Sequence, residues 1–214
     1  MKKPAVFLDR DGTLIEERGY LDRMELLSVF PWTADALRLL KRAGYALVVI
    51  TNQSALARGI IDEVFLNEVH RELSARLARG GAAIDHYYYC PHLADAPLER
   101  YRQACRCRKP GPGMIEQACR EMDLDPAASF MVGDRWLDVE CGIAAGTRAI
   151  QVLSGHGTRE DGARDLSRRS GDEGHAAKAD LSRRSAEGGR GAKADVILNN
   201  LMEAAGWILR NSAR

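Results

Sequence analysis

Two aspartates, Asp9 and Asp11, stand one residue apart at the end of a short apolar run, and Gly12 and Thr13 follow them. The run, residues 5–8, is too short for a helix and predicts a buried strand. Asp-x-Asp then places two carboxylates at the carboxyl end of that strand, where ligands bind in open α/β sheets. A strand end capped by two solvated acids is the alternative, so the choice depends on what else reaches this edge.

Other reactive side chains follow later strands. Thr51 follows the apolar run 46–50, Asp134 follows the run 130–132, and Lys109 lies in an irregular stretch after a third strand. Gathering several acids and a lysine on an apolar scaffold is costly unless they bind a ligand. Carboxylate oxygens suit Mg²⁺, and Mg²⁺, a lysine and a hydroxyl together could clamp a phosphoryl group during its transfer.

The elements that must position these side chains alternate along the chain. Short apolar runs predict strands at 5–8, 46–50, 84–89, 130–132, 149–153 and 196–198. Between them, apolar periodicity predicts helices, the first over 31–43, a second capped by Asp62 and the last over 201–209. Alternation of this kind predicts an α/β domain with a mainly parallel sheet and helices on both faces. Right-handed crossovers would then bring all the strand ends to one edge.

Two short pairs of residues offer metal ligands: Cys90 and His92, then Cys105 and Cys107. Three thiolates and one imidazole form a closed tetrahedral set, as in structural zinc sites. We therefore predict structural Zn²⁺ in a zinc loop, residues 90–107, which is too polar to hold its own shape without the metal. Incidental thiols are the alternative. Because Arg108 and Lys109 follow directly, the metal would also anchor the backbone of the lysine.

Composition narrows the class of protein. The 214 residues fit one domain, 1–214, and 45% apolar content is enough for a core. The net charge of +1 gives no global field that would favour nucleic acid or a membrane as partner. The apolar run near the N-terminus is too short for a signal peptide, so we expect a cytoplasmic protein. We also expect it to be a monomer. In that compartment five cysteines favour metal binding or burial over disulfides.

One segment breaks the alternation of strands and helices. Within 158–194, the string Asp-Leu-Ser-Arg-Arg-Ser begins at Asp165 and again at Asp180. The segment is rich in Gly, Ser, Arg and Ala and has few large apolar side chains. We interpret it as a tandem duplication inside a surface loop, and we expect that loop to be flexible.

The ordered set of these residues resembles the four motifs of the haloacid dehalogenase (HAD) superfamily: Asp9-x-Asp11-Gly12-Thr13, Thr51, Lys109 and Gly133-Asp134-x-x-x-Asp138. The resemblance implies a three-layer Rossmann-like fold and a phosphatase. Asp9 would attack phosphorus, and Asp11 would protonate the leaving oxygen and then activate water. Thr51 and Lys109 would neutralise the phosphoryl group.

The same resemblance implies a magnesium site. Asp9, Asp11 (through its carbonyl) and Asp134 would hold Mg²⁺, with Asp138 supporting the metal indirectly. Two of the motif residues have plainer alternatives. Thr51 could merely cap a strand end, and Asp138 could be an acid on a helix surface.

Further strings resemble one branch, the D-glycero-D-manno-heptose 1,7-bisphosphate 7-phosphatases and the related histidinol-phosphate phosphatases: Thr-Asn-Gln-Ser, Cys-Pro-His, Cys-x-Cys-Arg-Lys-Pro and Val-Gly-Asp-Arg. The resemblance covers residues 4–155 together with the last predicted strand and helix. It implies a small phosphorylated sugar as substrate and no large cap domain. A bisphosphate needs a second anion site, for which Arg108 and Arg135 are candidates because guanidinium grips phosphate bidentately. Further expected substrate contacts are Glu17, Arg18, Gly19, Tyr20, Asn52, Gln53 and Ser54.

Alternatives remain at this level. Each arginine could form a surface ion pair, and histidinol phosphate, which carries an amine and no second phosphate, would favour acids over arginines. Trp136 departs from the smaller residue expected after Arg135. A zinc-stabilised interaction module without catalysis is a competing class, although no required group is missing. A nucleic-acid processor is disfavoured by the near-neutral charge and the lack of a basic, aromatic groove.

Overall fold

The computed structural model describes residues 2–156 and 193–212. Nearly all of the duplicated segment predicted at 158–194 lies outside these described residues. Within them, six strands form one sheet in the order β3-β2-β1-β4-β5-β6, and every neighbouring pair is parallel. The strand order reverses between β1 and β4, which is where α/β folds of this kind bind ligands.

The predicted alternation of strands and helices is confirmed. The strands are β1 (Ala5–Leu8), β2 (Ala46–Asn52), β3 (His86–Cys90), β4 (Phe130–Gly133), β5 (Arg148–Val152) and β6 (Val196–Leu198). The helices are α1 (Thr33–Arg42), α2 (Ser54–Ala57), α3 (Glu63–Arg79), α4 (Gly113–Glu121), α5 (Trp136–Ala144) and α7 (Leu201–Asn211).

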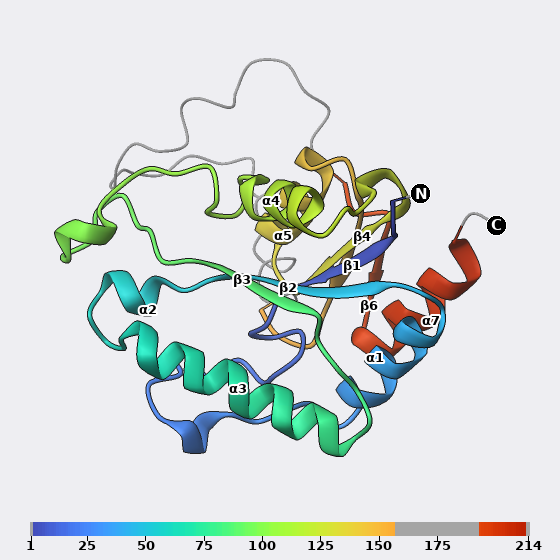
Figure 1. Cartoon of the computed structure of the whole chain (residues 1–214), viewed down its shortest axis with the longest axis horizontal. Helices are drawn as coiled ribbons and strands as arrows, with labels where there is room; N and C mark the ends of the chain where they lie inside the picture. Colours follow the sequence, from blue (N-terminus) through green and yellow to red (C-terminus); the bar gives the residue numbers. More distant parts are fainter. Residues whose placement is uncertain (1, 157–192, 213–214) are drawn as a thin grey trace, which may run out of the picture.

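The sheet has a layer of helices on each face, as Figure 1 shows. Side chains of β1 alternate between the faces because successive residues of a strand point in opposite directions. Val6 and Leu8 pack with α1, α3 and α7, whereas Ala5 and Phe7 pack with α4 and with Cys141 of α5. Burial on both faces explains why β1 reads as a continuous apolar run.

Two elements start two residues later than the sequence predicts. The third strand starts at His86 rather than at residue 84, because the Asp85 carboxylate accepts the Leu47 N–H at 2.7 Å in place of a strand carbonyl. The first helix starts at Thr33 rather than at residue 31. The Thr33 hydroxyl donates to the Leu14 carbonyl at 2.9 Å and so fixes the helix start against the loop that follows β1.

The connections near the carboxyl edge contain little regular secondary structure. Between β1 and α1 the chain forms only one short 3₁₀ helix, η1 (Met24–Leu26), and no large cap domain occurs among the described residues. None of the helices in the described ranges is long and apolar enough to span a bilayer. The carboxyl edge is therefore covered by loops and by the first turns of α2 and α5.

The turn after β1 depends on Gly12. Its φ is +80°, and a Cβ at this position would lie 2.4 Å from Oδ2 of Asp134. The Ser154 hydroxyl donates to the Gly12 carbonyl at 2.6 Å, and Gly155 covers the same turn. Loops after β1, β4 and β5 therefore meet at one point, and the close approach requires a residue without a side chain.

We expect Gly12→Ala to destabilise the fold by more than the roughly 1–2 kcal/mol of left-handed strain, because its methyl group would also displace Asp134. Gly146→Ala is the matched control: Gly146 has φ +82° with open space around it, so it isolates the strain. Chemical denaturation of both variants measures the difference. Equal losses of unfolding free energy would show that the contact with Asp134 is unimportant.

Candidate active site

The predicted catalytic side chains come together at the carboxyl ends of β1, β2 and β4. Asp9 follows β1, Thr51 lies near the end of β2, and Asp134 follows β4. All three are buried, as are Lys109 and Asp138. The alternative in which Asp138 is an acid on a helix surface is wrong, because its side chain is fully buried in the first turn of α5.

Lys109 lies at the centre of this group. Its Nζ is 2.6 Å from Oδ1 of Asp9, 2.6 Å from Oδ1 of Asp138 and 2.9 Å from the carbonyl oxygen of Ile50. The two carboxylates raise the pKa of Lys109 above its usual value even though burial acts in the opposite direction. Lys109 therefore stays charged, and it binds one oxygen of Asp9.

Three buried carboxylates crowd together beside this lysine. Ligand oxygens of Asp9, Asp134 and Asp138 lie within 4.8 Å of one another. Burial, with a contribution from Asp138, raises the pKa of Asp9 to about 7 despite Lys109, and burial together with Asp9 and Asp138 raises that of Asp134 to about 8. Among the described residues, Oδ1 of Asp134 has no hydrogen-bond partner. A crowded, underneutralised set of carboxylate oxygens fits a magnesium ion.

Asp11, the second acid of the predicted pair, is the more accessible one, with 22% of its side chain exposed. Its carboxylate accepts hydrogen bonds from Arg10 and from Nε2 of Gln53. Gln53 also donates to Oγ1 of Thr51 at 2.8 Å. Asp11 thus borders the open side of the site, whereas Asp9 lies deeper, beside Lys109.

A cavity of about 540 Å³ opens above these acids. Nearly all of the expected substrate-contact residues line it, together with Asp9, Asp11, Thr51 and Lys109: Glu17, Gly19, Tyr20, Asn52, Gln53, Ser54, Arg108 and Arg135. Burial and the charge of Asp11 raise the pKa of Glu17. Arg108, Arg135 and Glu17 therefore lie over the carboxylate cluster, together with several neutral hydrogen-bonding groups.

Arg18 does not line this cavity, contrary to the sequence expectation. It lies beside a neighbouring cavity of about 440 Å³ and forms an ion pair with Glu16 on the surface. The Arg18 side chain is exposed and that of Glu16 is partly exposed, whereas the intervening Glu17 lines both cavities. The alternative of a surface ion pair is the one that the structure shows for Arg18.

Two polar residues of the cavity wall, Arg10 and His156, were not among the residues expected from the sequence. Arg10 was overlooked because it lies between the two motif acids. His156 follows β5, and its backbone N–H donates to Oδ2 of Asp134 at 2.6 Å. The topology did contain a signal for His156, since β5 ends at the same edge as β1 and β4.

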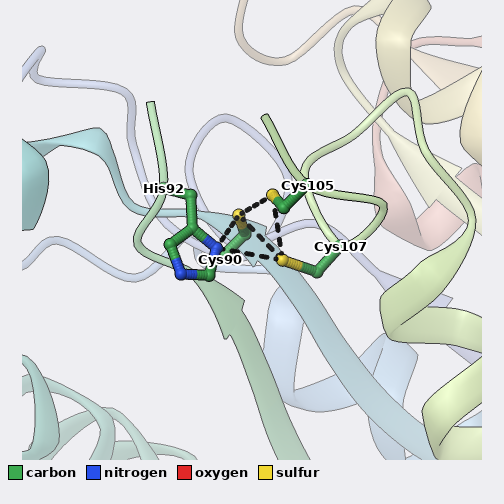
Figure 2. A group of neighbouring side chains, drawn as sticks. All are labelled: Cys90, His92, Cys105 and Cys107. Atoms are coloured by element: carbon green, nitrogen blue, oxygen red, sulfur yellow. Dashed lines mark hydrogen bonds between the residues drawn. The ribbon is translucent and has the colours of Figure 1, made fainter. Parts of the chain in front are cut away.

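The zinc-loop residues also come together, as Figure 2 shows. The three sulfur atoms of Cys90, Cys105 and Cys107 lie 3.1 to 3.5 Å apart, and Nδ1 of His92 lies 3.3 Å from Cys107 Sγ. A tetrahedral zinc ion, about 2.3 Å from each sulfur, places such ligands roughly 3.7 Å apart. Four ligand atoms at this spacing fit one metal ion and leave no open position on it.

The zinc loop packs more tightly than its polar sequence indicated. Tyr101 and Ala96 are buried against Leu56, Ala57 and Leu66 in a small apolar cluster. The Tyr101 hydroxyl donates to Glu63, the first residue of α3, at 2.8 Å. Residues of α2 and α3 therefore offer part of this loop an apolar surface, and its dependence on the metal stays a prediction.

One hydrogen bond joins the zinc loop to Arg108, and two others hold the backbone of Lys109. The Asn52 side chain accepts from the Lys109 N–H at 3.0 Å and donates to the Lys109 carbonyl at 3.1 Å. Arg108 donates from Nη1 to the carbonyl of His92 at 3.0 Å. The backbone of Lys109 and the side chain of Arg108 are thus both positioned by neighbouring main-chain or side-chain groups.

Comparison with known proteins agrees with this geometry. A HAD-hydrolase-like family model matches residues 106–180. The D-glycero-beta-D-manno-heptose-1,7-bisphosphate 7-phosphatase of Photorhabdus laumondii is 44% identical over 69% of this chain and 79% of its own length. The Escherichia coli K12 protein of that name is 42% identical over 69% of this chain and 78% of its own length.

A solved structure is similar over almost the whole chain. The D,D-heptose 1,7-bisphosphate phosphatase of B. bronchiseptica, complexed with magnesium and phosphate, superposes with a TM-score of 0.73 at 27% identity and covers 97% of this chain and 98% of its own. From the identities, the shared fold and the gathered motif residues, we conclude that the chain belongs to the heptose-1,7-bisphosphate 7-phosphatase family of HAD-like hydrolases.

Proposed function

We propose that the protein is a Mg²⁺-dependent phosphatase that removes the 7-phosphate of D-glycero-D-manno-heptose 1,7-bisphosphate. The observation that carries the proposal is the buried network of ion pairs in which Lys109 contacts both Asp9 and Asp138, with Asp134 nearby. This network lies beneath a cavity that Arg108 and Arg135 line. The names of the relatives support the sugar and its β anomer. The enzyme would work in the cytoplasm, as a monomer, on a pathway that supplies heptose for lipopolysaccharide.

Asp9 is the nucleophile in this proposal. Lys109 holds Oδ1 of Asp9, which leaves the other carboxylate oxygen to attack phosphorus. The bond between phosphorus and the sugar oxygen breaks, and Asp11 gives its proton to that oxygen, so the sugar leaves as an alcohol. Asp11 then takes a proton from the water that attacks the acyl phosphate, which releases inorganic phosphate and restores Asp9.

Positive charge supports both steps. Lys109 and Thr51 border the position of the transferring phosphoryl group, where their N–H and O–H groups would neutralise its oxygens. Asp9, Asp134 and the Asp11 carbonyl would hold the magnesium ion, which supplies charge neutralisation at the same oxygens when it is bound. Asp138 acts through Lys109, with which it pairs directly.

The far end of the cavity would recognise the rest of the sugar. Arg108 and Arg135 line it and are the candidates for binding the 1-phosphate. Glu17, Tyr20 and Ser54 offer acceptors and donors for sugar hydroxyls, and Gly19 lies among them. Histidinol phosphate, the alternative substrate, has no second phosphate and would give these two arginines no anion to bind.

Zinc completes the proposal. We assign Zn²⁺ to Cys90, His92, Cys105 and Cys107, where it would have a structural role. Because Arg108 donates to the His92 carbonyl, the metal would also fix the direction of the Arg108 side chain. Zinc would thus affect the substrate site only indirectly, through the position of Arg108.

Asp9→Asn tests the nucleophile. We expect phosphate release to fall below detection while the melting temperature stays within a few degrees, because Lys109 keeps its ion pair with Asp138. In the unaltered protein, rapid quench with substrate should trap a base-labile phosphoprotein that Asp9→Asn does not form. Near-normal turnover by the variant would rule out Asp9 as the nucleophile.

Arg108→Ala tests the substrate. We expect kcat/KM for the heptose bisphosphate to fall by about 10- to 100-fold, the effect of about 1.5–3 kcal/mol for a hydrogen bond to a charged group. For histidinol phosphate the change should be under about threefold, since Arg108 has no anion to bind there. A steady-state panel of both substrates and fructose 1,6-bisphosphate measures this. Faster turnover of histidinol phosphate by the unaltered protein would favour the alternative.

Removal of zinc tests the structural site. Metal analysis should find about one Zn²⁺ per chain, and Cys107→Ser should lose it. We expect this variant to melt at lower temperature and to bind the bisphosphate more weakly, because Arg108 loses its support. Cys119→Ser, on α4 and outside the cluster, is the matched control. A folded, stable Cys107→Ser protein without zinc would contradict the structural role.

A further inference from the structure

The proposed acid, Asp11, is held by a buried network that continues away from the cavity. Arg10 donates from Nε and Nη2 to the Asp11 carboxylate, at distances of 3.0 to 3.3 Å. Nη2 of Arg10 also donates to Oε1 of Gln53 at 3.2 Å, and Gln53 donates from Nε2 to Oδ2 of Asp11 at 3.2 Å. Asp11, Arg10 and Gln53, which all line the cavity, therefore form a closed set of contacts that fixes the direction of the carboxylate.

The remaining nitrogen of the Arg10 guanidinium, Nη1, faces His70 of α3. Nη1 of Arg10 lies 3.3 Å from Nε2 of His70. The His70 ring is buried and stacks on the ring of Tyr87 from β3, with centroids 4.5 Å apart and planes 15° from parallel. Its position is thus fixed by the helix and by the stack, and its Nε2 is aimed at Arg10.

The protonation state of His70 makes it an acceptor. Burial and the nearby Arg10 charge lower the pKa of His70 to about 3, so the ring is neutral at neutral pH. A guanidinium has only donors, and a neutral imidazole with its proton on Nδ1 offers one acceptor at Nε2. Arg10 accordingly finds acceptors on Asp11, Gln53 and His70, and its direction is determined on each side.

We propose that Arg10 and His70 are positioning residues that hold the Asp11 carboxylate in the direction from which it transfers a proton to the leaving oxygen of the substrate. The inference rests on the proposed function of Asp11 as acid and base. A positioned acid contributes about 10²- to 10⁴-fold to the rate of such a step, and small displacements of the proton lose much of that factor. His70 does not touch the cavity, so it acts only through Arg10.

The need of the leaving group for a proton distinguishes a role in positioning Asp11 from a purely structural role. A sugar oxygen must be protonated as it leaves, whereas nitrophenolate leaves readily without a proton. The ratio kcat/KM reports the steps up to departure of the leaving group, so it excludes the later hydrolysis of the acyl phosphate. Loss of Asp11 positioning should therefore lower kcat/KM for the heptose bisphosphate much more than for 4-nitrophenyl phosphate.

Variants of His70 and Arg10 test the proposal with full-length, metal-loaded protein. His70→Phe keeps the ring stack and removes the acceptor, and we expect kcat/KM for the bisphosphate to fall about tenfold or more with under about threefold change for the aryl phosphate. His70→Gln restores an acceptor and should recover most of the lost ratio. Arg10→Lys keeps the charge but cannot reach Asp11, Gln53 and His70 together, so it should reproduce His70→Phe without altering α3.

Ser74→Ala is the matched control. Ser74 lies one turn further along the same helix, and the variant removes its 2.9 Å hydrogen bond with Tyr87. We expect kcat/KM to stay unchanged for both substrates. Equal losses on both substrates in His70→Phe and Arg10→Lys, or no loss in either variant, would overturn the proposal. If the unaltered protein does not hydrolyse the bisphosphate, the proposed function fails instead. The same ratio can then be measured with any alkyl phosphate that the protein does hydrolyse.

Discussion

A lysine ammonium buried between two carboxylates is the interaction on which the rest of the structure depends. Lys109 binds Asp9 and Asp138 at 2.6 Å each, and Asp134 adds a third carboxylate nearby. Removing the lysine from such a buried group typically costs about 3–5 kcal/mol, because it leaves the carboxylates uncompensated. Removing one carboxylate leaves Lys109 paired with the other. With all three acids ionised, one lysine leaves two negative charges uncompensated, and a divalent cation is the simplest way to balance them.

The position of this lysine is determined by segments that are distant in the sequence. Asn52, the last residue of β2, holds the N–H and the carbonyl of Lys109 with a single side chain. The Ile50 carbonyl of the same strand accepts from Nζ. The pairing of β2 with its neighbours therefore also places the lysine against Asp9. The register of the sheet thus determines the geometry of the site.

Much of this centre could be predicted from the sequence, because it depends on strand ends. Asp9, Thr51 and Asp134 follow short apolar runs, and parallel topology brings the ends of those runs together. Other residues could not be predicted in this way. His70 has the spacing of an ordinary residue on the buried face of a helix, and nothing local indicates that Arg10 reaches it. Arg18 was misplaced because the local string does not reveal which of two adjacent charged residues turns outward.

The apolar cluster around Tyr101 has a consequence for how the molecule opens. Leu56 and Ala57 belong to α2, Leu66 belongs to α3, and Tyr101 and Ala96 belong to the zinc loop. Residues that share one small core exchange their amide hydrogens through the same opening event, as a cooperative unit. The cavity-facing start of α2 thus shares its local stability with the zinc loop, more than thirty residues away, and rigidity at the cavity wall is a collective property of that unit.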